Sequence, residues 1–170
     1  MIHPKIEALV ASKMLDFMIP ADNVANVIDQ HTLSTGLLIL TQSNYTMIPV
    51  LSAESKLMGV ISMSMIIKAV MTVDAIEMER LDELKVRDVM LSQPVRVQAN
   101  CHLADVLNYL IDQNFVCVVD GDNRFLGIIT RKNVMQRLTH LLHLTSNPGE
   151  VARLIKLFET AEAAVSYTHL

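Results

Sequence analysis

The chain has 170 residues, of which 51% are hydrophobic and 19% are charged. This composition can build a sizeable core and excludes a chain that is disordered over most of its length. The formal net charge of −4, without a long run of Lys or Arg, argues against binding to DNA or to an anionic membrane surface. No apolar run approaches the roughly 20 residues of a membrane-spanning helix. The N-terminal sequence lacks the pattern of a secretory signal, which predicts a cytoplasmic protein.

One unit occurs twice in the sequence, at a nearly constant offset. Asp16-Phe17-Met18 recurs as Asp88-Val89-Met90 at an offset of 72, and the glycine of Gly59-Val60-Ile61-Ser62 recurs in Gly127-Ile128-Ile129-Thr130 at an offset of 68. A repeated unit of this length indicates two copies of one supersecondary structure that bury their apolar faces against each other.

The elements follow the same order in both copies. The first copy is expected to have strands at 24–27, 46–51 and 57–62 and helices at 33–41 and 64–71. The second is expected to have strands at 95–97, 116–119 and 125–130 and helices at 103–111 and 131–142. The helix at 103–111 has apolar residues at positions i, i+3, i+4, i+7 and i+8, and Asp120-Gly121 is a hairpin signal between two strands.

Each copy is therefore a strand, helix, strand, strand, helix unit, and the sequence predicts an α+β fold. The two units are expected to pack about a pseudo-twofold axis. Further helices are expected at 5–17, 73–85 and 149–164. The expected organisation is a helical lead at 1–13, a first motif at 14–73, a helical connector at 74–85, a second motif at 86–142, and a C-terminal helix and tail at 143–170.

Short segments of both copies resemble a known family. Ile48-Pro49-Val50-Leu51 and the two glycine-containing strands resemble CBS domains, so that residues 14–142 are similar to a tandem CBS pair, or Bateman module. The segments at 17–22, 44–51 and 115–118 resemble, more narrowly, the small stand-alone cyclic-di-AMP-binding CBS proteins of Gram-positive bacteria. The resemblance implies a non-catalytic sensor of adenine nucleotides, with cyclic di-AMP as its ligand and AMP or ATP as candidate competitors.

The junction between the last strand and the following helix favours an anion. The first N–H groups of a helix have no partner within it, and Thr130 is a suitable N-cap. Arg131 and Lys132 add two positive charges where the helix dipole disfavours cations unless a phosphate binds. The equivalent Met63-Ser64-Met65 has no basic residue, which predicts one phosphate site per chain. The alternative is that both basic side chains lie on a solvated helix face.

Recognition of adenine requires a flat apolar slot with hydrogen-bonding groups at its edge. Suitable residues are Val24, Ala25, Tyr45, Thr46, Met47 and Pro49. The family resemblance implies that Ala25, Thr46 and Met47 contact the base, and that Arg131 and Lys132 contact phosphate. Ile128 and Thr130 complete the predicted nucleotide-binding set. For Met47 and Pro49, ordinary core packing is the alternative.

The sequence departs from the family pattern at three positions. CBS domains that hold a ribose commonly have Asp three residues after the Ser or Thr, where this chain has Met65 and Asn133. Close relatives often have Lys before the first strand, where this chain has Asn23. These differences predict no carboxylate contact to ribose and one phosphate contact fewer, and hence weaker binding or a different ligand.

No residue pattern indicates catalysis or a metal. Cys101 and Cys117 lack CxxC spacing and are interpreted as core residues, and no phosphate-binding glycine motif is present. His140 and His143 have no third ligand spaced to join them. We therefore expect a protein that is not an enzyme and that has no cofactor besides its nucleotide ligand.

Two functions of different classes remain. In the first, the protein binds cyclic di-AMP and thereby changes a surface that it presents to a partner protein. The resemblance implies a homodimer, and a partner such as a stringent-response nucleotide synthetase or a central metabolic enzyme. In the second, the protein is a ligand-independent CBS scaffold, with some of its 11 Met residues making adaptable protein contacts.

Overall fold

The computed structural model describes residues 17–73, 75–144 and 149. Residues 13–131 form one compact unit, called the main unit below, and residues 1–12 with 132–170 form another. Apart from their end residues 17 and 149, the helices expected at 5–17 and 149–164 lie outside the described residues. Within the described part of the chain, no helix combines the length and the apolar character needed to cross a bilayer.

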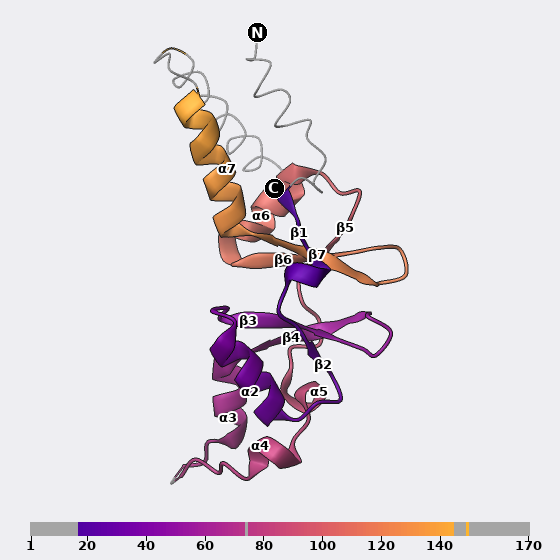
Figure 1. Cartoon of the computed structure of the whole chain (residues 1–170), viewed down its shortest axis with the longest axis vertical. Helices are drawn as coiled ribbons and strands as arrows, with labels where there is room; N and C mark the ends of the chain where they lie inside the picture. Colours follow the sequence, from indigo (N-terminus) through magenta and orange to yellow (C-terminus); the bar gives the residue numbers. More distant parts are fainter. Residues whose placement is uncertain (1–16, 74, 145–148, 150–170) are drawn as a thin grey trace, which may run out of the picture. The chain divides into compact units, whose positions relative to one another are not determined.

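The main unit contains two sheets, one for each copy of the repeat (Figure 1). The first sheet has the order β2-β3-β4 and consists of β2 (Val27–Ile28), β3 (Met47–Leu51) and β4 (Leu57–Ser62). The second has the order β1-β7-β6-β5 and consists of β1 (Ile19–Pro20), β5 (Arg96–Gln98), β6 (Phe115–Val119) and β7 (Phe125–Thr130). In each copy a parallel pair, β2 with β3 or β5 with β6, is followed by an antiparallel hairpin.

Helices complete both copies close to the predicted positions. The first copy has α2 (Leu33–Gln42) and α3 (Met63–Val70), and the second has α6 (Leu103–Asp112) and α7 (Arg131–Leu144). Figure 1 shows α2 and α3 on the side of β3 and β4 that faces away from β6 and β7. The core on that side contains Ile48, Val50 and Ile61 from the strands, with Leu33, Leu40, Ile66 and Val70 from the helices. Because successive side chains of a strand point to opposite faces, one side of β3 and β4 faces the helices and the other side faces the second sheet.

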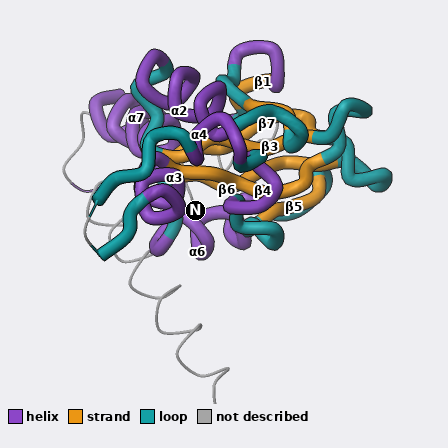
Figure 2. Tube along the Cα trace, turned by 90° about the horizontal axis from the view of Figure 1, so that it is seen from below, coloured by secondary structure: helices purple, strands orange, loops and turns teal. Residues whose placement is uncertain are grey.

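The two sheets share one core, as expected for a pseudo-twofold pair. Val60 and Leu57 of β4 pack in one buried cluster with Cys117 of β6 and Ile128 of β7. Figure 2 looks along the stacking direction, and the strands of the two sheets overlap in that view. The hairpin turns exchange equivalent hydrogen bonds, from Leu57 N to Asn123 O (3.0 Å) and from Phe125 N to Ser55 O (2.9 Å).

The hairpin of each copy pairs with the segment that precedes the other copy in the sequence. β1 precedes the first copy but pairs with β7 of the second, with Ile19 opposite Ile128 and Pro20 opposite Gly127. Reciprocally, Leu91 precedes β5 but forms a bridge with Val60 of β4. Glycine is required at both contacts, because a Cβ on Gly127 would overlap the carbonyl oxygen of Ile19, and one on Gly59 would overlap that of Leu91.

The prediction of a helix over residues 73–85 is wrong for most of that range. The structure has only α4 (Arg80–Glu83) there, followed by α5 (Val86–Val89). Thr72 closes a turn instead, because its N–H and its hydroxyl both donate to the carbonyl of Ala75, at 2.8 and 3.0 Å. A threonine hydroxyl that bonds nearby backbone groups offers the chain an alternative to helical hydrogen bonds.

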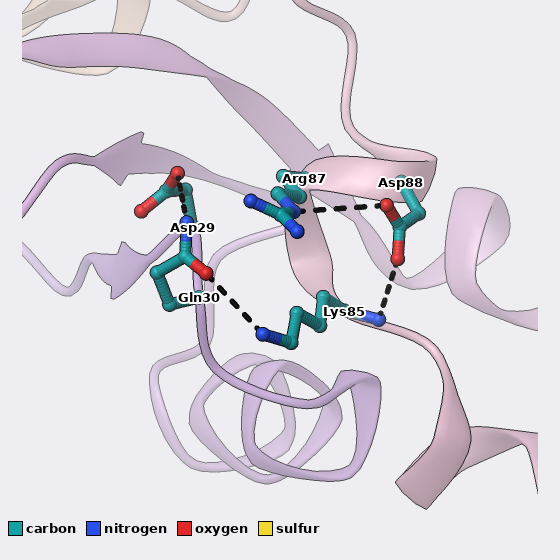
Figure 3. A network of polar contacts seen from close by, with 5 residues as sticks. All are labelled: Asp29, Gln30, Lys85, Arg87 and Asp88. Atoms are coloured by element: carbon teal, nitrogen blue, oxygen red, sulfur yellow. Dashed lines mark hydrogen bonds and ion pairs between the residues drawn. The ribbon is translucent and has the colours of Figure 1, made fainter.

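A polar network fixes the start of α5 against the end of β2 (Figure 3). The N–H of Lys85 donates to Asp88 Oδ2 (3.0 Å), and its ammonium donates to Gln30 Oε1 (3.3 Å). The Gln30 amide in turn donates to the buried carboxylate of Asp29 (3.1 Å). The second copy therefore begins at a fixed position relative to the first.

Candidate functional site

A cleft of about 320 Å³ opens in the main unit between segments of the two copies. The first copy contributes the start of β3, the end of β4 and the start of α3, and the second contributes the segment before β5 and the turn between α6 and β6. The lining residues are Thr46, Met47, Val60, Ser62, Ser64, Leu91, Gln93, Pro94, Val95, Asp112, Gln113, Asn114 and Phe115. This volume lies in the range of small-molecule pockets.

The cleft is the pseudo-symmetric counterpart of the site predicted from the sequence. At the repeat offset of 70, Val24 and Ala25 are equivalent to Pro94 and Val95. At the offset of 68, Met47 is equivalent to Phe115. At the same offset of 68, Tyr45 and Thr46 are equivalent to Gln113 and Asn114. Thr130 and Lys132 are likewise equivalent to Ser62 and Ser64. All seven counterparts line the cleft. The predicted set omits these counterparts because the sequence places the phosphate only beside Arg131 and Lys132, and the equivalent junction at Met63-Ser64 has no basic residue.

Hydroxyl groups and a helix N-terminus form the floor of this cleft. Ser62 ends β4 and caps α3, its Oγ accepting from Met65 N at 3.3 Å and sharing a hydrogen bond of 2.9 Å with Ser64 Oγ. The capping geometry follows from the sequence, because Ser is a preferred N-cap between a strand and a helix. This end of the cleft can therefore exchange hydrogen bonds with a polar ligand.

The cleft lacks positive charge. Among the described residues that line it, none is Lys, Arg or His, and Asp112 is the ionisable one. Val95, Pro94, Met47 and Phe115 supply apolar surface. The donor and acceptor set suits an uncharged group such as a base or a ribose better than a phosphate, since a phosphate would lie near a carboxylate without a cation to balance it.

Arg131 lies at the end of β7, where it closes the C-terminus of α6. Its Nε donates to Leu110 O at 2.8 Å, and its Nη2 donates to Ile111 O (3.1 Å) and Gln113 O (3.0 Å). Its backbone N–H donates to Asn114 O at 2.9 Å. The last turn of α6 has no basic residue of its own, so its carbonyl groups need a donor from elsewhere. Within the described residues Nη1 makes no hydrogen bond, so two guanidinium donors remain on the exposed side chain.

The other predicted residues fall into buried and accessible groups. Val24 and Ile128 belong to the core between the sheets, with 6% and 1% of their surface exposed, and Tyr45 and Met47 pack against that core. Pro49 is buried within β3, opposite Val60. Val24, Pro49 and Ile128 can therefore form only the floor of a binding site, whereas Tyr45 and Met47 are half-buried and Met47 lines the cleft.

The accessible predicted residues lie at strand ends. Thr46 is exposed at the start of β3, and Thr130 is half-buried at the end of β7, opposite Phe115. Ala25 is half-buried and packs on the helix-facing core of the first sheet. Lys132 is exposed and is the first residue of α7 that belongs to the second compact unit.

Metal and thiol chemistry have little support in the described residues. No group of three or more His, Cys, Asp or Glu is placed there to hold a metal ion. Cys117 is fully buried, and desolvation raises the pKa of its thiol to about 12. Burial, with a smaller effect of the Asp105 carboxylate, also raises the pKa of Cys101. Neither thiol has the lowered pKa of a reactive cysteine.

Two facing copies of a strand, helix, strand, strand, helix unit, with a cleft between their strand ends, define a paired-repeat module of the CBS type. The CBS domain family model matches residues 86–140. Cyclic di-AMP receptor B of Bacillus subtilis is 36% identical over 138 residues, which cover 81% of this chain and 94% of that protein.

Solved structures show the same similarity. The CbpB protein of Listeria monocytogenes in complex with c-di-AMP is 40% identical and superposes with a TM-score of 0.74, covering 79% of this chain and all of that one. A CBS domain-containing protein of unknown function from Bacillus anthracis is 35% identical, with a TM-score of 0.74 and coverage of 79% and 98%. The chain belongs to the family of CBS-domain proteins that includes these relatives, and the expected α+β fold is confirmed.

Proposed function

We propose that this protein is a receptor for cyclic di-AMP, and that it binds the dinucleotide beside the junction of β7 and α7. A difference between two equivalent junctions carries the proposal. Thr130 is followed by Arg131 and Lys132, whereas Ser62 is followed by Met63 and Ser64. Of the two pseudo-symmetric positions, one thus has the cations that a phosphodiester requires. The relatives whose names contain cyclic di-AMP support this choice of anionic ligand.

Arg131 is suited to phosphate because its side chain is already held in place. The three carbonyl contacts at the end of α6 use Nε and Nη2, which leaves the Nη1 edge for an anion. A guanidinium that is fixed before binding loses less side-chain entropy when a ligand arrives. Charge-assisted hydrogen bonds to phosphate contribute roughly 1.5–3 kcal/mol each. Lys132 would add a second cation.

The base would be recognised by residues at the starts of the first-copy strands. In this proposal Ala25, Thr46 and Met47 contact adenine, with Tyr45 beside them. The buried residues Val24, Pro49 and Ile128 form the floor beneath the base. AMP and ATP carry the same base and are proposed as competitors.

We further propose that the receptor acts through a partner protein. A ligand changes the affinity for a partner only if it binds two states of the receptor differently, so the loaded and unloaded forms must differ at a surface. In this proposal the protein is a non-catalytic cytoplasmic homodimer. The proposed partner is a stringent-response nucleotide synthetase or a central metabolic enzyme, as in the resemblance noted above.

Calorimetry with cyclic di-AMP, AMP and ATP tests the proposal. Lys132→Gln and Arg131→Gln should each weaken binding of cyclic di-AMP by about tenfold or more, because each removes a charge-assisted contact. Arg124→Gln is the matched control, since it removes an exposed Arg from the turn before β7. Circular dichroism melts check that each variant folds.

Two outcomes would count against different parts of the proposal. If no adenine nucleotide produces heat with the wild type, the ligand-independent scaffold is the remaining function. If both glutamine variants bind as tightly as the wild type, the assignment of phosphate to Arg131 and Lys132 is wrong.

A further inference from the structure

The connection between α3 and α4 displays four large apolar side chains. Met71, Val73, Ile76 and Met78 expose 53%, 100%, 55% and 60% of their surface. Single exposed apolar residues are ordinary, but a contiguous apolar patch commonly marks a site of protein interaction. We call these four residues the 71–78 surface; Figure 1 shows the connection at the lower end of the first copy.

Hydrogen bonds hold the 71–78 surface in a defined shape. Met71 and Ile76 form an antiparallel bridge, and Glu77 N donates to Val70 O at 2.8 Å. Directly opposed residues of an antiparallel pair project to the same side, so the side chains of Met71 and Ile76 lie together. Thr72 closes the turn between them through its bonds to Ala75. A partner that binds here meets the side chains of Met71 and Ile76 already held side by side, which lowers the entropic cost of docking.

The residues around this apolar surface are mainly acidic. Glu77, Glu79, Asp82 and Glu83 are exposed. Two basic residues lie nearby: Arg80, which pairs with Glu77 at 3.5 Å, and Lys68 in the last turn of α3. Glu79, Asp82 and Glu83 still leave an excess of negative charge beside the apolar side chains.

We propose that the 71–78 surface is the docking site for a basic amphipathic helix of a partner protein. The apolar face of such a helix would cover Met71, Val73 and Ile76, and its Lys or Arg side chains would meet the acidic border. A second copy of this chain fits less well, because a twofold contact would bring like charges together. An anionic membrane would be repelled by the same border.

The proposed docking site and the cleft lie at opposite ends of one helix. Ser62 caps the N-terminus of α3 at the cleft, and α3 ends at Val70, next to Met71. The docking site itself does not depend on the proposed nucleotide function.

The test uses a fluorescently labelled probe peptide of about 18 residues, five helical turns, with Leu on one face and Lys on the other. Fluorescence anisotropy measures its binding to the full chain. Val73→Ser combined with Ile76→Ser should weaken binding by about tenfold or more, because two anchoring side chains are lost. Leu38→Ser, which removes a side chain of α2 that is 56% exposed, is the control and should leave binding unchanged. Glu79→Lys with Glu83→Lys should weaken binding and reduce its salt dependence.

Three results would overturn the proposal. The first is binding of the Lys peptide that Val73→Ser with Ile76→Ser does not change. The second is equal binding of a peptide in which every Lys is replaced by Glu. The third is a wild-type dimer in sedimentation that the same double variant converts to a monomer, since the surface would then be covered by a second copy.

Discussion

Arg131 Nε lies 2.8 Å from the carbonyl oxygen of Leu110, a residue near the end of α6 that is separated from Arg131 by β6 and β7. The contact ties the end of β7 to the end of α6 and satisfies carbonyl groups that α6 cannot satisfy itself. The segment that it fixes continues through Asp112 and Asn114, which line the cleft of the other pseudo-symmetric site. One residue thus belongs to the predicted phosphate site and supports a wall of its counterpart.

Arg131→Ala should therefore destabilise the fold as well as weaken ligand binding. Arg131 donates three hydrogen bonds to carbonyls at the end of α6, but its side chain is exposed, so water replaces much of each bond when it is removed. We therefore expect the free energy of unfolding to fall by about 1.5–3 kcal/mol in total, which is less than three times the value of one charge-assisted bond. Urea denaturation of the ligand-free protein measures this effect. Arg124→Ala removes an exposed Arg and should change stability by less than about 0.5 kcal/mol. Equal stability of wild type and Arg131→Ala would contradict the assigned role at the end of α6.

Gly127→Ala should disrupt the pairing of β1 with β7. Gly127 has a φ of 155°, and an added methyl group would overlap the carbonyl oxygen of Ile19. We expect a loss of roughly 2–4 kcal/mol of stability, because alanine is strained at this φ and β1 must move. Thermal or urea unfolding measures it. Gly121→Ala is the control, since no atom lies within 4 Å of the added methyl group. A Gly127→Ala protein as stable as this control would show that the close contact is dispensable.

Basic residues transferred to the first copy should create a second phosphate site. Met63 and Ser64 occupy the positions equivalent to Arg131 and Lys132, and both are exposed. Met63→Arg with Ser64→Lys should raise the stoichiometry of cyclic di-AMP from one per chain to two, because the equivalent cleft would gain the missing cations. Calorimetric titration gives the stoichiometry. Met63→Gln with Ser64→Gln is the neutral control and should leave one site. An unchanged stoichiometry in the basic variant would show that charge is not what distinguishes the two clefts.

Cys117 should make stability decrease with pH in alkaline solution. Burial raises the pKa of its thiol from 9.0 to about 12, so between these values the unfolded chain loses a proton that the folded protein keeps. The unfolded state then binds fewer protons, and the free energy of unfolding falls as pH rises through this window. Within this window the free energy of unfolding of the wild type should fall by about 1.4 kcal/mol per pH unit more than that of Cys117→Val. This variant is the control because valine has no ionisable side chain. Parallel pH profiles for the two proteins would contradict this assignment.

Much of the fold could be predicted because its determinants are local and occur twice. Apolar runs on either side of the polar turns at 52–55 and 120–123 predict both strand pairs, and the amphipathic pattern predicts α6 to within one residue. The prediction of a helical connector is wrong because Thr72 forms local hydrogen bonds that compete with those of a helix. The exchange of β1 and Leu91 between the copies was missed, since backbone pairing between distant short segments leaves no periodic signal.

The candidate site was predictable in composition more than in geometry. The residue types around Thr46 and Met47 predict an apolar slot beside Arg131, whereas the structure places both residues in the lining of the counterpart cleft, with Ser62 and Asn114. The role of Arg131 at the end of α6 could not be inferred, because Leu110 and Gln113 are distant in sequence and offer only their backbone carbonyls. Whether Arg131 and Lys132 contact phosphate stays a prediction.

The exchange of leading segments makes the duplicated halves mutually dependent. If the chain were cut at the connector, the second copy would lose β1, which covers the outer edge of β7, and the first copy would lose the bridge from Leu91 to β4. Uncovered strand edges pair readily with other chains, so such a fragment would be prone to aggregate. The sheet of the second copy is therefore complete only when β1 from the start of the chain joins it, so the two copies depend on each other as one folding unit.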